Sequence, residues 1–108
     1  MTYETVLNQL GYIPNEALAE QLSRIEKNTA GYEKIIKHIL DLHEALKTDE
    51  SFVALSNSND YFKIKIDANS DVSAADALEK INHFAEKYKV TLQKVDGKPT
   101  YYILGFAA

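Results

Sequence analysis

The chain has no cysteine and a single arginine, Arg24. The lack of cysteine excludes disulfides, thiolate nucleophiles and every metal site that needs sulfur ligands. A bidentate site for phosphate or carboxylate would have only one guanidinium to draw on. Four glycines, none in a clustered motif, exclude a glycine-rich phosphate loop and a dinucleotide-binding fingerprint. Several common cofactor sites are therefore removed at the outset, and we expect no cofactor.

Long hydrophobic runs are also missing. No stretch approaches the roughly 18 consecutive apolar residues that a membrane-spanning helix needs. The first residues, Met1–Glu4, lack the basic and apolar regions of a signal peptide, which favours a cytoplasmic location and no membrane contact. What remains is a chain of 108 residues with 45% hydrophobic and 26% charged residues, ordinary values for a globular protein. We expect one domain spanning residues 1–108.

Charge is unevenly distributed along this acidic chain. The net charge is −4, and residues 1–59 hold nine acidic side chains against five basic ones. Residues 60–108 balance at seven against seven, with lysine as the only base. Phosphates would be repelled by the first half of the chain, so the charge pattern favours a basic partner and weighs against nucleic acid.

Apolar spacing predicts helices in the first half of the chain. Thr2 and Asn15 are suitable N-caps for a helix over residues 3–10 and for a second helix from Glu16. From there, apolar side chains recur at alternating steps of four and three, the pattern of a coiled coil or helix bundle. Nine positions form this seam: Leu18, Leu22, Ile25, Thr29, Tyr32, Ile36, Ile39, His43 and Leu46. Residues 28–31 have the composition of a turn, which leaves a helical hairpin as the alternative, but the unbroken phase favours one continuous or kinked helix over residues 15–47.

The second half changes to a period of two and indicates a ββαββ unit. Strands are predicted over 51–55 and 61–67, a helix over 73–88, and strands over 89–95 and 100–106. The last strand is apolar or amphipathic on both faces, which is typical of a central strand. The predicted fold class is α+β, with a helical region at 1–48 and a four-stranded, mainly antiparallel sheet within 51–108.

The segment Asp67–Ser73 begins like a calcium-binding loop, with oxygen side chains at alternate positions. The resemblance ends where such a loop needs glycine and glutamate, because those positions hold Val72 and Leu78. We interpret the segment as a turn and N-cap before the 73–88 helix.

The histidines and acids form no catalytic pattern. His38 and His43 are five residues apart, not the three or four that bring two ligands onto one helical face, and His83 lies between Glu79 and Lys87 on a charged face. No metal site is expected. Nor is there a nucleophile with a base and an orienting acid at recognisable spacing. The sequence therefore favours a protein that is not an enzyme.

One face of the predicted sheet could interact with nucleic acid. Alternation on the second strand places Tyr61, Lys63 and Lys65 together, and one of Tyr101 or Tyr102 can join them. Tyrosines on a sheet are more often cross-strand packing partners. With the chain's acidity and single arginine, this interpretation ranks last.

The leading hypothesis is a small protein-binding adaptor or accessory factor. An acidic helix with an apolar seam suits coiled-coil association, so we expect a homodimer and an interaction with another protein. The alternatives are a small enzyme or ligand-binding protein with a site near the 73–88 helix, and a nucleic-acid-binding domain that uses the lysine and tyrosine face. The residues predicted to carry association are Leu18, Leu22, Ile25, Tyr32 and His43.

Overall fold

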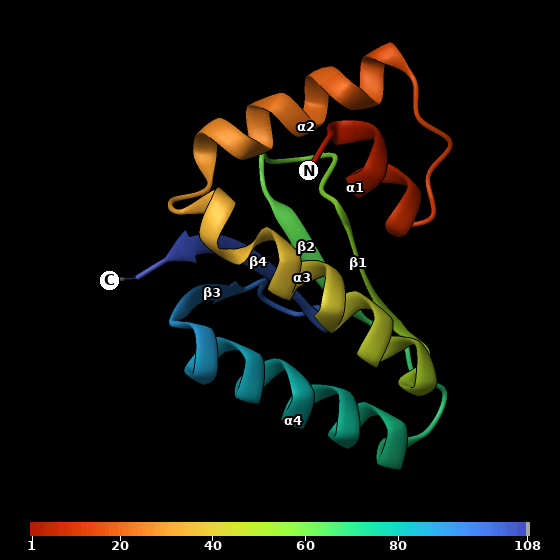
Figure 1. The fold of residues 1–108 in the computed structure, drawn as a ribbon. Coiled ribbons are helices and arrows are strands. Elements are labelled where there is room, and N and C mark those ends of the chain that lie inside the picture. Colours follow the sequence, from red (N-terminus) through yellow and green to blue (C-terminus); the bar gives the residue numbers. More distant parts are fainter. Residues whose placement is uncertain (108) are drawn as a thin grey trace.

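The computed structural model describes residues 1–107 and confirms the α+β fold class. The elements follow the predicted order of helices and then a ββαββ unit (Figure 1). In chain order they are α1 (Tyr3–Gln9), α2 (Glu16–Asn28), α3 (Tyr32–Leu46), the short 3-10 helix η1 (Lys47–Asp49), β1 (Ser51–Leu55), β2 (Phe62–Ile66), α4 (Asp71–Tyr88), β3 (Val90–Lys94) and β4 (Thr100–Phe106). None of the helices within residues 1–107 is long and apolar enough to cross a membrane.

Side-chain caps fix the start of three helices. Thr2 and Asn15 accept hydrogen bonds from backbone N–H groups in the first turns of α1 and α2, at 3.2 and 2.8 Å. Ser70 does the same for α4, accepting from the backbone N–H of Ser73 at 3.1 Å. Each cap satisfies one of the N–H groups that a helix start leaves without a partner. Helix α4 therefore begins at Asp71, two residues before the predicted start.

The four strands form an antiparallel sheet in the order β1-β2-β4-β3, so β4 is an interior strand as predicted. Side chains on the inward face of the sheet lie opposite one another on neighbouring strands. Val53 of β1 pairs with Ile64 of β2, and Phe62 of β2 pairs with Ile103 of β4. These four side chains are at most 1% exposed and form the centre of the hydrophobic core.

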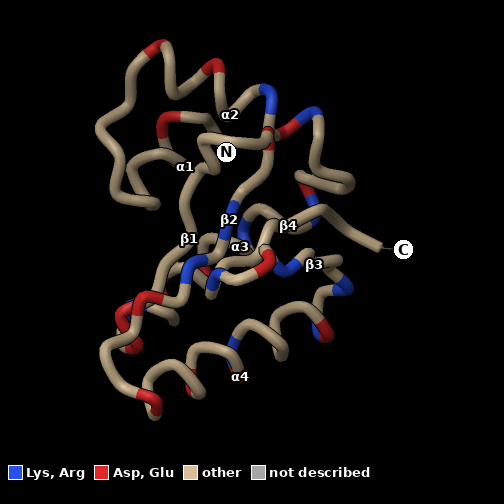
Figure 2. Tube along the Cα trace, turned by 180° about the vertical axis from the view of Figure 1, so that it is seen from behind, with Lys and Arg blue, Asp and Glu red and all other residues tan. Residues whose placement is uncertain are grey.

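The helices cover only one face of the sheet. Helices α3 and α4 lie side by side across that face, and α1 and α2 lie beyond one end of the strands (Figure 1). Seen from behind, the strands lie in front of α3, and within residues 1–107 no helix covers this second face (Figure 2). Its side chains, among them Lys63, Lys65 and Tyr102, are half-buried, in contrast to the fully buried residues of the core face.

Residues 15–47 do not form the one helix that the spacing favours but two helices joined by a turn, which is the alternative. Helix α2 ends at Asn28, and α3 begins at Tyr32 after a left-handed Gly31 with φ of 65°. Ala30, the middle one of the three residues between them, forms a parallel β-bridge with Gly105 of β4, and its carbonyl accepts a hydrogen bond from the N–H of Phe106 at 2.7 Å. The backbone at Ala30 therefore bonds to the sheet instead of continuing the helix.

This contact requires glycine at position 105. A Cβ built on Gly105 would lie 2.5 Å from the backbone nitrogen of Ala30 and 2.8 Å from its oxygen, and the φ of 143° is one that other residues rarely adopt. Any larger side chain would push the junction between α2 and α3 off the sheet.

We expect Gly105→Ala to lower the free energy of unfolding by about 2–4 kcal/mol, because it adds both a steric clash and backbone strain. Gly97→Ala is the matched control. Its φ is 72° but nothing lies within 4 Å of the added Cβ, so only the backbone strain of about 1 kcal/mol applies. Urea unfolding of the two variants measures the difference, and equal losses would contradict the role given to the Ala30 contact.

Candidate functional site

The residues predicted to carry association lie in or against the core of the chain. Leu22 and Ile25 are 0% exposed and belong to the same hydrophobic cluster as Val6 and Leu7 of α1. Leu18 is half-buried against that cluster. Self-association through Leu22 and Ile25 would therefore require α2 to leave the core.

Tyr32 and His43 also make their contacts within the chain. The ring of Tyr32 stacks on Phe62 with centroids 6.2 Å apart, and burial raises the pKa of its hydroxyl. His43 is 6% exposed, and its Nδ1 accepts a hydrogen bond from the backbone N–H of Val53 at 3.0 Å. Because Nδ1 accepts, the neutral ring carries its proton on Nε2.

We expect the double variant Leu22→Asp, Ile25→Asp to lose cooperative unfolding, because two carboxylates would replace fully buried side chains. The control is Ala17→Asp with Glu20→Asp, at two exposed positions of the same helix. Circular dichroism during heating tests both. If the double variant keeps a cooperative transition but has a lower mass by light scattering than the unchanged chain, Leu22 and Ile25 lie at an interface between two chains and the prediction is wrong.

His43 makes stability depend on pH. Burial and the nearby Lys47 lower its pKa from the ordinary 6.5, with a smaller opposing effect from Glu44. The folded chain therefore favours the neutral ring, and this contribution is complete above pH 6.5 and lost as pH falls through the lowered pKa. We expect His43→Gln, which does not titrate, to flatten the decline in unfolding free energy as the pH falls below 6.5. His83→Gln, at an exposed position, should keep the decline, and a wild-type profile in His43→Gln would contradict the assignment.

The open face of the sheet contains a groove of about 530 Å³. Three lysines reach it from different parts of the chain, and no carboxylate is among its lining residues. We call it the lysine groove and define it by Ser56, Ser58, Lys63, Lys65, Lys98 and Tyr102.

Strand geometry places two of these lysines. On β2, Lys63 and Lys65 alternate with the buried Phe62 and Ile64, so both side chains point to the open face. In the neighbouring strand, Tyr102 lies opposite Lys63. The rings of Tyr61 and Tyr102 are 6.0 Å apart, so the tyrosine and lysine face suggested by the sequence forms with Tyr102, not Tyr101, as its second tyrosine.

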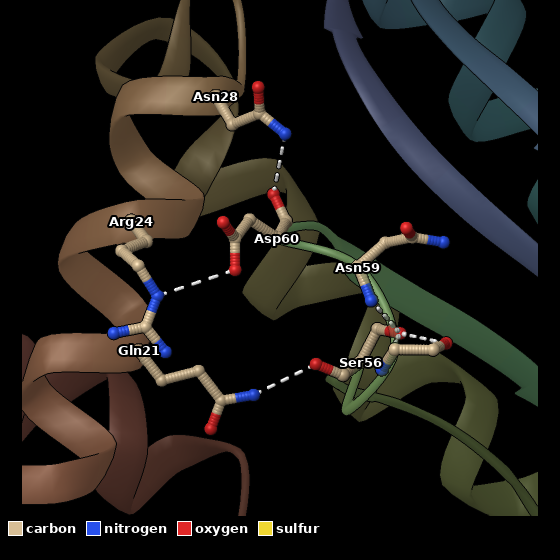
Figure 3. A network of polar contacts seen from close by, with 7 residues as sticks. Gln21, Arg24, Asn28, Ser56, Asn59 and Asp60 are labelled. Atoms are coloured by element: carbon tan, nitrogen blue, oxygen red, sulfur yellow. Dashed lines mark hydrogen bonds and ion pairs between the residues drawn. The ribbon is translucent and has the colours of Figure 1, made fainter.

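Helix α2 holds the β1–β2 loop that borders the groove (Figure 3). Gln21 donates from Nε2 to the carbonyl of Ser56 at 2.8 Å, and Asn28 donates from Nδ2 to the carbonyl of Asp60 at 3.0 Å. Arg24 reaches the carboxylate of Asp60 at 3.4 Å. This ion pair is about half exposed and adds little stability, but it offsets the only acidic side chain of the loop.

Within residues 1–107, the lysines of the groove form no ion pair with a carboxylate. The ion pairs found among residues 1–107 join Arg24 with Asp60, Lys47 with Glu44, and Lys80 with Asp49. Hydrogen bonding to Ser58 and its neighbours, with a smaller effect of Lys98, lowers the pKa of the Tyr102 hydroxyl. The groove thus presents ammonium groups, hydroxyls and an aromatic edge to an anion.

A second groove of about 540 Å³ lies between α3 and α4, on the helical side of the sheet and opposite the open face. His38 and His83 are among the residues that line it. His38 stacks on Tyr88 with centroids 3.7 Å apart. Across residues 1–107, no group of three or more histidine or acidic side chains is placed to hold a metal ion. Comparison of the chain with protein-family models, curated proteins and solved structures finds no match.

Sequence reasoning missed Lys98 and the two serines of the lysine groove. They come from the β3–β4 turn and the β1–β2 loop, which border opposite ends of the groove because β2 pairs with β4. The predicted hairpins contained these residues, but the strand order that places both connections at one groove has no local signal.

Proposed function

We propose that the chain is a non-catalytic binding protein that holds a single-stranded nucleic acid across the open face of its sheet. The observation that carries this proposal is the lysine groove, where Lys63, Lys65 and Lys98 converge without a carboxylate among the lining residues. Ammonium groups are strong partners for phosphate, and the hydroxyls beside them add neutral hydrogen-bond donors.

The net charge of −4 does not oppose this binding, because charge acts locally in salt solution. At physiological ionic strength, interactions between exposed charges decay over about 8 Å. Lys63 and Lys65, two residues apart on one strand, are separated by about 6.6 Å along the strand. They therefore act on the same segment of a bound polymer, whereas acidic side chains on the helical side of the sheet are screened from it.

The tyrosines favour a single strand over a duplex or a phosphorylated peptide. Unpaired bases stack on aromatic side chains, with each base contributing about 1–3 kcal/mol, and stacking needs no sequence-specific contacts. Tyr61 and Tyr102 provide such rings beside the lysines. In a duplex the base faces are already stacked on one another, and a phosphopeptide has no base to offer.

Fluorescence anisotropy with a labelled oligothymidine of about twelve nucleotides tests the proposal. With three lysine contacts, the logarithm of the association constant should fall with the logarithm of salt concentration with a slope of about −2. Lys63→Gln with Lys65→Gln should weaken binding about tenfold and reduce the slope to about −0.7. Lys27→Gln with Lys37→Gln, an equal charge change on exposed helical positions, should leave binding nearly unchanged.

Tyrosine variants and competitors test the single-stranded ligand. Tyr102→Leu should weaken oligothymidine binding, whereas Tyr102→Phe, which keeps the ring, should retain most of it. Equal binding of an abasic oligomer or inorganic polyphosphate would show an anion site without base recognition. Preference for a phosphopeptide or a duplex, or equal losses in both lysine pairs, would overturn the proposal.

A further inference from the structure

The groove between α3 and α4 has an apolar floor and an acidic rim. We call it the helix groove and define it by Asp41, Leu42, Asp76, Glu79, Phe84 and Tyr88. We propose that it is the docking site for a basic amphipathic helix of a partner protein. This site is separate from the lysine groove and does not depend on the function proposed for it.

The length of the groove, worked out from the helical positions of its lining residues, equals that of a short helix. Its α4 wall extends from Asp76 to Tyr88, and twelve steps of helical rise correspond to about 18 Å. Along α3, His38, Asp41, Leu42 and Ala45 recur at steps of three, one and three, so they form one stripe facing the groove. A helix of about twelve residues, or three turns, matches that length.

The apolar surface within reach of an occupant comes from the exposed Ala45 and the half-buried ring of Tyr88, which closes one end against His38. Leu42 and Phe84 form the base beneath them and are only 5% and 3% exposed. Helix-in-groove recognition uses such a floor for side chains spaced three and four residues apart on the incoming helix. The occupant must therefore have an apolar stripe.

Charge complementarity selects a basic helix. Asp41, Asp76 and Glu79 are exposed on the rim, and within residues 1–107 no cation lies within ion-pair distance of them. Lys80 does not neutralise them, because its ammonium group is bound to Asp49 at 2.7 Å and to two further oxygens near the end of α3. Lys87 lies over the ring of Tyr88 and keeps its charge, so the three carboxylates face one ammonium group that is not bound to an acid.

Two other occupants fit the groove less well. A second copy of the chain could meet the acidic rim with its lysine groove, but that surface is a sheet face and not a helix with an apolar stripe. A nucleic acid would be repelled by the carboxylates of the rim. Lysine or arginine side chains flanking an apolar stripe satisfy both the floor and the rim.

Titration with a synthetic peptide tests the site in the full-length chain. The probe is a helical peptide of about fourteen residues with a leucine stripe flanked by lysines, a length that adds one residue at each end to the twelve-residue groove. The comparison peptide has glutamate in place of each lysine. At physiological salt, we expect the basic peptide to bind and the acidic one not to bind. Backbone amide NMR shifts should concentrate in α3 and α4.

Variants identify the charges responsible. Asp41→Asn with Glu79→Gln should weaken binding of the basic peptide about tenfold, and Ala45→Arg, which places a cation in the groove, should abolish it. Glu16→Gln with Glu20→Gln makes the same charge change at exposed positions of α2 and should leave binding unchanged. Thermal unfolding checks that each variant remains folded.

Three results would overturn the proposal. They are equal binding of the acidic peptide, equal losses in the two charge-neutralised pairs, or NMR shifts located away from α3 and α4. Binding of small apolar amines in the groove, without binding of the basic peptide, would also contradict the proposal, because the ligand would then be a small molecule and not a helix. Binding of oligothymidine is measured separately, so failure at one groove leaves the test of the other intact.

Discussion

The close approach of Ala30 to Gly105 determines where the N-terminal helices lie. Because Gly105 has no Cβ, the backbone of Ala30 comes within bonding distance of β4 and receives a hydrogen bond from Phe106. The junction between α2 and α3 is thereby anchored to the sheet, and the helical hydrogen bonding that would have continued through residues 29–31 is replaced. Helix α2 then lies over the β1–β2 loop and fixes one border of the lysine groove, so a backbone contact in the core positions a surface site (Figure 3).

A one-sided helical layer explains the character of the open sheet face. Helices α3 and α4 remove one face from water, so fully buried and half-buried residues alternate along β1, along residues 62–65 of β2 and along residues 102–106 of β4. Lysine and tyrosine suit the second face because each covers the sheet with apolar atoms and keeps a polar end in water. The residues that make this face stable without a covering layer are also those that can contact phosphates and bases.

Patterns local in sequence predicted most of the fold. Alternation located β2 and its outward lysines, capping residues located the starts of α1 and α2, and the apolar character of β4 placed it inside the sheet. The heptad-like seam was correct as a buried surface, since Leu22, Ile25 and Ile39 are 0% exposed. Its phase could not reveal the break at residues 29–31, although Gly31 gave a local turn signal; the contact that holds the break against the sheet is made by Gly105, which is far away in sequence. Periodicity likewise cannot say whether a buried seam faces the same chain or another.

The sites depend on the pairing of distant segments in the same way. The lysine groove needs β2 beside β4, and the helix groove needs α3 beside α4; neither neighbour relation has a sequence signature. The total charge was a poor guide for the same reason, since it averages over faces that the fold separates. The smallest dimension of the chain is 25 Å, about three times the screening length in physiological salt. Surfaces on opposite sides of such a molecule act on their ligands almost independently, so a basic sheet face and an acidic helical face coexist on one small acidic protein.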